Sequence, residues 1–145
     1  MPGVRETIAG HLLSAWPNEG CGVLVGDVTA GGVKRVYEAV GMANVEPARG
    51  RDRYQLDPRA NMKLEVRLRD RKYSYASLIL GFFHSHPDGV AQPSAIDLEM
   101  AQGLFEFTHI FYIYAIQAVS KDAAGEFTFW RLSQERESFT RLEIQ

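Results

Sequence analysis

The chain has 145 residues, of which 46% are hydrophobic and 23% charged, an ordinary composition for one domain (residues 1–145) that can bury a core. A formal net charge of -2 argues against a general nucleic-acid binder, and the single Cys21 excludes an intramolecular disulfide. No leader segment and no 18-residue apolar stretch is recognisable, so we expect a soluble, cytoplasmic protein without nucleic-acid or membrane partners.

The N-terminal part of the chain predicts one helix and a hairpin. Apolar residues recur near the helical period over residues 4–16, and Pro17 ends that pattern. Two β-rich runs follow, CGVLVGDV (21–28) and VKRVYEAV (33–40), separated by TAGG. Short β-rich runs joined by a glycine-containing turn predict a β-hairpin.

The segment from Arg49 to Lys72 is strongly basic. It holds nine of the 16 Lys and Arg residues against four acids, so it carries +5 while the rest of the chain carries -7. Within it, RYQL (53–56) is a candidate short strand, and Asp57 before Pro58 predicts the start of a second helix that reaches about Lys72. The charge fits either a solvated helix face or a docking surface for an acidic protein.

The C-terminal part predicts three strands and one helix. SLILGFF (77–83) is a continuous apolar run of strand length, which is typical of a buried strand. A third helix is predicted over Ser94 to Phe105, a second buried strand in HIFYIYAIQAV (109–119) and a last strand in GEFTFWRL (125–132). This order predicts an α/β fold of the α+β sandwich type, with a central mixed β-sheet flanked by helices.

Two histidines stand at the end of the apolar run, in FFHSHP. His84 and His86 are two residues apart, so in an extended strand both imidazoles point to one side while Ser85 faces the other. Imidazole pairs suit zinc, whose catalytic sites commonly have three protein ligands. Because such pairs also occur as ordinary polar side chains at strand ends, a third ligand is needed to decide.

Ser94 and Asp97 follow at the predicted start of the third helix. S-x-x-D before an apolar periodic segment is also a signature of helix capping. The turn PDGVAQP returns the chain to the strand end, so the Asp97 carboxylate could reach a metal held by the histidines. Capping and metal binding are compatible, because the Ser94 backbone can start the helix while its hydroxyl faces a substrate.

The pattern H-S-H-P followed by Ser94 and Asp97 resembles the JAMM motif, also called MPN+ or Jab1/MPN/Mov34, of zinc metallo-isopeptidases. That family also has an upstream glutamate in a context like E-x-C-G-x-L-x-G. The stretch NEGCGVLVG places Glu19 in register with it. The resemblance runs from the first helix to about Leu132, and it implies the cytidine-deaminase-like JAMM/MPN fold.

The same resemblance implies a site and an activity. Zn²⁺ would be bound by His84, His86 and Asp97, Glu19 would be the general base for attack by zinc-bound water, and Ser94 would donate to the oxyanion. The implied function is a metallopeptidase or isopeptidase that hydrolyses an amide bond at the C-terminal tail of a ubiquitin-like or sulfur-carrier protein. Small prokaryotic members of the family process such substrates. The sequence does not indicate an oligomeric state.

Two other functions stay open. A non-catalytic MPN scaffold is one, although the complete set of ligands argues against it. A RadC-type protein, from a branch that shares the histidine and S-x-x-D pattern and has been linked to DNA, is the other. Such proteins usually carry an extra helical DNA-binding region, for which 145 residues leave no room.

Five further polar residues are candidates of lower weight. We expect Cys21 to be a small buried residue. His11 and His109 are expected to be structural, and Asp88 to be either a loop residue or a hydrogen-bond partner of a histidine. Asn44 resembles a polar position of the family, and its role is unassigned.

Overall fold

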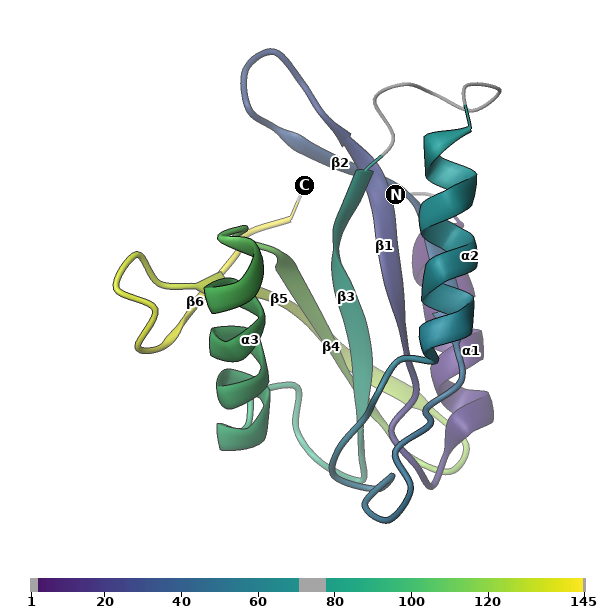
Figure 1. Ribbon diagram of the computed structural model, residues 1–145. Helices are drawn as coiled ribbons and strands as arrows, with labels where there is room; N and C mark the ends of the chain where they lie inside the picture. Colours follow the sequence, from purple (N-terminus) through teal and green to yellow (C-terminus); the bar gives the residue numbers. More distant parts are fainter. Residues whose placement is uncertain (1–2, 71–77, 145) are drawn as a thin grey trace.

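A computed structural model describes residues 3–70 and 78–144 of the chain (Figure 1). The described residues form a six-stranded sheet of order β2-β1-β3-β4-β5-β6. Within it β3 and β4 are parallel, and the other neighbouring strands pair antiparallel. The elements are, in chain order, α1 (Val4–Ala15), β1 (Cys21–Val28), β2 (Lys34–Met42), α2 (Pro58–Arg69), β3 (Leu78–Pro87), α3 (Ala95–Thr108), β4 (Ile113–Val119), β5 (Ala124–Leu132) and β6 (Phe139–Arg141).

Helix α1 covers one face of the sheet, behind the strands in Figure 1. Its stripe of Val4, Ile8 and Leu12 is buried against a cluster that includes Phe83 and Phe129. The helical spacing of these apolar residues places them on one side of α1, which is why the periodic pattern predicted this helix correctly.

Helices α2 and α3 cover the opposite face, in front of the sheet in Figure 1. Leu64 of α2 is buried in one apolar cluster and Ala101 of α3 in another, and Phe82 of β3 packs against both. Because alternate residues of a strand point to the same side, His84 faces the α2 and α3 side, as Phe82 does.

The predicted hairpin is confirmed by the antiparallel pairing of β1 with β2. The predicted cap is also confirmed, since the Asp57 side chain accepts from the backbone N–H of Arg59 at 3.0 Å. Helix α2 ends at Arg69, and residues 71–77, which include the predicted end at Lys72, lie outside the described residues. The short strand predicted in RYQL (53–56) is wrong: Leu56 forms an isolated bridge with Asn44.

The third helix is longer than predicted and the following strand is shorter. α3 continues past Phe105 to Thr108, and His109 ends it in the left-handed conformation with φ 56°. β4 therefore begins at Ile113 and not at His109. The three-residue strand β6 was not predicted, because it is too short to show a periodic pattern.

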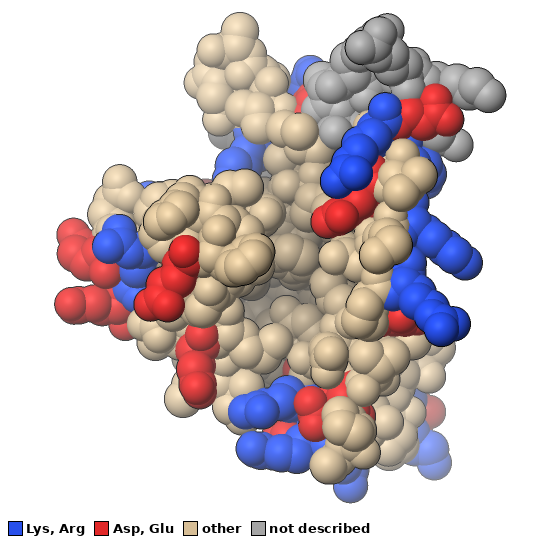
Figure 2. Space-filling view, in the orientation of Figure 1, with Lys and Arg blue, Asp and Glu red and all other residues tan. Residues whose placement is uncertain are grey.

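Charges of opposite sign lie on the two sides of the face shown in Figure 2. Lys and Arg side chains follow α2, acidic side chains lie over α3, and a hollow separates the two helices. Exposed members include Arg59 and Lys63 on α2, and Glu99 and Glu106 on α3. Across residues 3–70 and 78–144, the helices are too short or too polar to cross a bilayer.

Candidate metal centre

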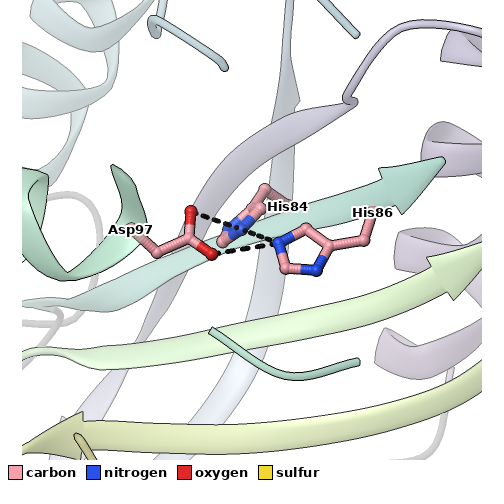
Figure 3. Close-up of side chains that lie close together, drawn as sticks. All are labelled: His84, His86 and Asp97. Carbon is pink, nitrogen blue, oxygen red and sulfur yellow. Dashed lines mark hydrogen bonds and ion pairs between the residues drawn. The ribbon is translucent and has the colours of Figure 1, made fainter. Parts of the chain in front are cut away.

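Strand β3 presents its two histidines to one point, as the sequence predicted. The Nε2 atoms of His84 and His86 lie 3.2 Å apart (Figure 3). Ser85 faces the other way: its hydroxyl accepts from the backbone N–H of Gly20 at 2.8 Å, and its own N–H donates to the Gly20 carbonyl at 3.1 Å. The middle residue of HSH thus fixes the loop that carries Glu19 to the histidine strand.

Helix α3 supplies the third side chain through its N-terminal cap. The Asp97 N–H donates to the Ser94 hydroxyl at 3.1 Å, and the Ser94 N–H donates to Asp97 Oδ2 at 2.9 Å. This capping box orients the Asp97 carboxylate toward the strand. Its Oδ1 lies 3.1 Å from His84 Nε2, and its Oδ2 lies 3.0 Å from His86 Nε2 (Figure 3).

The second ring nitrogens of the two histidines differ in their surroundings. His86 Nδ1 donates to the carbonyl oxygen of Val90 at 2.7 Å, so Nδ1 carries a proton. In the neutral ring this leaves Nε2 as the free ligand atom. His84 Nδ1 is buried and has no hydrogen-bond partner among the described residues.

The side chains of His84, His86 and Asp97 are largely buried, which strengthens the interactions between their charges. His84 is 2% exposed and Asp97 is 8% exposed. Burial alone would raise the pKa of Asp97, yet hydrogen bonds from His84 and His86 hold that pKa well below its usual range. Burial likewise would lower the pKa of His86, and the neighbouring Asp97 carboxylate raises it instead. The carboxylate therefore stays ionised and attracts a positive charge to this point.

The three side chains suit a metal ion. A tetrahedral zinc ion with ligand bonds of about 2.0–2.2 Å keeps its ligand atoms about 3.3 Å apart. The three contacts among His84 Nε2, His86 Nε2 and Asp97 are 3.0 to 3.2 Å. Two imidazole nitrogens and one carboxylate oxygen are donors that zinc accepts, so His84, His86 and Asp97 could hold a metal.

Glu19 lies in the loop between α1 and β1 and is 4% exposed. Its backbone is held from both sides, because its N–H donates to the Gly50 carbonyl at 2.6 Å and its carbonyl accepts from Asn44 Nδ2 at 3.0 Å. Its Oε1 is buried without a hydrogen-bond partner among the described residues. Burial, together with the charge of Asp97, raises the pKa of Glu19 to about 8.

Ser94 is exposed, and its hydroxyl oxygen is itself part of the helix cap. The expectation that the backbone of Ser94 alone would start the helix is therefore incomplete. Since the oxygen accepts from Asp97 N–H, what the hydroxyl retains is its own proton, which can be donated.

The other candidates have structural surroundings. Burial raises the pKa of Cys21 to about 12, so this fully buried residue stays a neutral thiol. His11 Nε2 contacts the carbonyl oxygens of Cys21 and Met42 at 2.9 and 3.1 Å, and His109 ends α3. Asp88 Oδ1 accepts from the indole N–H of Trp16 at 3.2 Å, and no hydrogen bond joins Asp88 to a histidine within residues 3–70 and 78–144.

Two features of the site were not foreseen from the sequence. The ring of Tyr54 is stacked on the ring of His84, with centroids 4.7 Å apart and planes inclined by 27°. The unassigned Asn44 is bound to the backbone on both sides of Tyr54, as well as to Glu19. The sequence singled out Asn44 only through its resemblance to a family position, and it gave no signal for Tyr54 or for these contacts, because residues 43–57 follow no periodic pattern.

Comparison with known proteins agrees with this geometry. The profile of the family described as prokaryotic homologs of the JAB domain matches residues 1–133. The chain belongs to the prokaryotic JAB-domain family. The resemblance drawn from HSHP, Ser94 and Asp97 is thereby confirmed. A JAB1/MPN domain protein of Archaeoglobus fulgidus has the same fold, with a TM-score of 0.55. It is 18% identical, and the match covers 99% of this chain and 93% of that one.

Three other known proteins match much of the chain. Desampylase of Haloferax volcanii is 37% identical over 97 residues, which are 67% of this chain and 61% of desampylase, so the match spans about three fifths of that relative. A Salinibacter ruber protein is 32% identical, covering 99% of this chain and 88% of that one, with a TM-score of 0.69. A Desulfitobacterium hafniense protein is 24% identical, covering 100% of this chain and 89% of that one, and it shares the fold with a TM-score of 0.73.

Proposed function

We propose that this JAB-domain protein is a zinc-dependent hydrolase that cuts an amide bond at the C-terminal tail of a ubiquitin-like protein. The observation that carries the proposal is the convergence of His84, His86 and Asp97 at 3.0 to 3.2 Å. The buried Glu19 carboxyl, whose Oε1 has no hydrogen-bond partner among the described residues, lies close enough for the charges of Asp97 and His86 to act on it. The similarity to desampylase, together with the JAMM motif, supports the substrate class.

The residues divide the chemistry among them. Zinc held by His84, His86 and Asp97 would supply Lewis acidity, which makes water a strong nucleophile near neutral pH. Glu19 would take the proton of the attacking water and pass it to the leaving amine nitrogen, as a general base and then a general acid. The carboxyl of Glu19 would ionise more readily beside a bound cation, and the ionised form is the one that accepts the proton.

Ser94 acts on the oxygen of the scissile carbonyl. Its hydroxyl oxygen is fixed by the Asp97 N–H, so its proton is free to point at a substrate. A hydrogen bond to the developing oxyanion stabilises the transition state more than the ground state. The capping box thus places both the proposed ligand Asp97 and the proposed donor Ser94 within the first turn of α3.

We take the hollow next to Tyr54 as the approach of the substrate tail toward the three side chains. A hollow of about 390 Å³ lies beside the ring that stacks on His84. An extended C-terminal tail fits such a hollow better than a folded domain does, which agrees with cleavage next to a flexible tail. The hollow is lined by Glu46, Arg53, Tyr54, Gln55, Glu99 and Met100.

The basic surface of α2 is proposed to dock the body of an acidic substrate protein. Part of the basic segment is neutralised within the molecule, because Arg49 pairs with Asp52 at 2.9 Å and Arg67 with Glu38 at 2.9 Å. Arg59 and Lys63 of α2 are exposed. Exposed charges at the edge of an interface speed association more than they strengthen the complex once it has formed.

Charge reversal tests this docking. Lys63→Glu should raise KM several-fold and leave kcat unchanged, with a smaller difference at high salt because screening weakens exposed charges. Arg5→Glu is the matched control and should leave both constants unchanged, because Arg5 is exposed on α1 at the opposite face of the sheet, where it lies over the rings of Phe127 and Phe129. Equal KM values for the Lys63 and Arg5 variants would exclude α2 as the docking surface.

The activity is tested with defined substrates. Zinc-loaded protein is incubated with two kinds of substrate. One is a small sulfur-carrier protein with a C-terminal extension after Gly-Gly, and the other is the same carrier joined to a lysine side chain. The products are identified by mass. We expect a cut after Gly-Gly, and we expect Glu19→Gln to bind zinc without cutting. Cleavage by the Gln variant at the wild-type rate would remove Glu19 as the base. A protein that binds no zinc would favour a scaffold over an enzyme.

A further inference from the structure

The two histidine ligands are held by different means. A metal-bound histidine usually donates its second ring N–H to a carbonyl or carboxylate, which fixes the plane of the ring. His86 follows this rule through the Val90 carbonyl at 2.7 Å. His84 does not, because its buried Nδ1 lacks a hydrogen-bond partner among the described residues.

What contacts the His84 ring is the face of Tyr54. The two centroids are 4.7 Å apart and the planes are inclined by 27°, which is a stacked arrangement. Tyr54 is 8% exposed, so its ring is confined and cannot move aside freely. A confined ring against an imidazole restricts rotation about the bond that joins the imidazole to Cβ, which is the motion that would turn Nε2 away from Asp97.

Tyr54 in turn is fixed by one side chain. Asn44 Nδ2 donates to the carbonyl of Arg53 at 3.1 Å, and Asn44 Oδ1 accepts from the N–H of Gln55 at 3.0 Å. The residues before and after Tyr54 are thus bound to the same amide. Asn44 Nδ2 also donates to the Glu19 carbonyl at 3.0 Å, so this amide connects the loop that carries Glu19 to the loop that carries Tyr54.

We propose that Tyr54 is a positioning residue for the metal ligand His84, taking by stacking the place of the missing hydrogen bond, and that Asn44 positions Tyr54. The inference rests on the proposed metal site and is independent of which protein is cleaved. Loss of the aromatic ring of Tyr54 should therefore weaken zinc binding, whereas loss of its phenol oxygen should not.

Zinc affinity provides the test, measured by competition with a chromophoric chelator. Loss of a group that orients a metal ligand typically weakens metal binding by about 10- to 100-fold, and we expect this loss for Tyr54→Leu. Tyr54→Phe keeps the ring and is the matched control, expected within about twofold of wild type on the same principle. Equal affinities of the Leu and Phe variants would overturn the proposal. Absence of zinc binding in the wild type would instead overturn the metal site itself.

A double-mutant cycle tests the link through Asn44. Asn44→Ala should weaken zinc binding in the wild-type background and add little when Tyr54 is already Leu, because residues that act through one another are not additive. Additive losses would show that Asn44 does not act through Tyr54. Circular dichroism checks that each variant is folded.

A measurement on the wild type covers the case in which a variant does not fold. Nuclear Overhauser contacts between the ring protons of Tyr54 and His84 are expected both in chelator and with one equivalent of zinc. Persistence of these contacts with zinc supports stacking as the means of positioning. Their loss on zinc binding would overturn the proposal, because a ring that leaves the ligand cannot orient it.

Discussion

Ser94 combines an observed role in the fold with a proposed role in the site. Its hydroxyl accepts from the Asp97 N–H at 3.1 Å, and its proton remains available to a substrate carbonyl. Removing the cap and removing the donor are separable changes, because glycine is nearly as good as serine at an N-cap but has no hydroxyl.

Two substitutions of Ser94 separate these roles. Ser94→Ala should lower the free energy of unfolding by about 1 kcal/mol, and Ser94→Gly by only a few tenths. Both should lower kcat by about 100- to 1000-fold, as loss of an oxyanion donor does. Thermal unfolding and steady-state kinetics measure the two effects. Wild-type kcat in the Gly variant would reduce Ser94 to a helix cap.

The buried carboxyl of Glu19 predicts a pH dependence in metal-free protein. Burial, with the charge of Asp97, raises its pKa from 4.5 to about 8. Between these values the folded protein keeps a proton that the unfolded chain has released, so the free energy of unfolding falls as pH rises from about 4.5 to 8. The expected fall from this group is on the order of 3–5 kcal/mol.

Chemical denaturation in chelator at several pH values measures this fall. Glu19→Gln has no proton to lose, so the variant should match the wild type near pH 5 and be the more stable protein at pH 8. The titrations of Asp97 and His86 contribute to the pH dependence of stability in both proteins, so these contributions largely cancel in the comparison. Parallel stability curves for the two proteins would contradict a raised pKa at Glu19.

At the scale of elements, close strand packing around the histidine strand requires glycine. A Cβ on Gly22 of β1 would overlap the ring of Phe83 and the carbonyl oxygen of Val40. Gly103 in α3 differs, since nothing lies within 4 Å of a Cβ added there. The first glycine permits the approach of β1 to its neighbours, and the second only weakens a helix.

These two glycines give opposite predictions for the same substitution. Gly22→Ala should destabilise the protein by about 1–3 kcal/mol or more, through overpacking against backbone atoms. Gly103→Ala should stabilise it by about 0.5–1 kcal/mol, because alanine is the better helix former. Denaturation midpoints of both variants provide the measurement. A stabilising Gly22→Ala would show that β1 can shift without cost to the sheet.

The elements with strong periodic patterns were predictable, and the contacts between loops were not. The stripe of α1 and the apolar run of β3 follow from spacing alone, and they carry His84 and His86 to their place. Ser94 and Asp97 were predictable because a helix cap has a local signature. The stacking of Tyr54 and the bonds of Asn44 depend on how an irregular loop folds back on β3, which no local pattern encodes.

At the scale of the whole molecule, the metal should link the two layers of the fold. Its proposed ligands come from β3 in the sheet and from α3 in the layer that covers it. A ligand that binds only the folded state stabilises it by about 4 kcal/mol at 1,000 times its Kd. Zinc removal should therefore lower the melting temperature, and zinc should no longer raise it in His86→Ala. An unchanged melting temperature in chelator would argue against a metal shared by β3 and α3.

An anomalous difference map at the zinc edge, from crystals of the zinc-loaded protein, tests the proposed metal site. We predict one strong peak in contact with His84 Nε2, His86 Nε2 and the Asp97 carboxylate, whose atoms already lie 3.0 to 3.2 Å from one another. A map with no peak at these three side chains, or with zinc bound elsewhere, would contradict it.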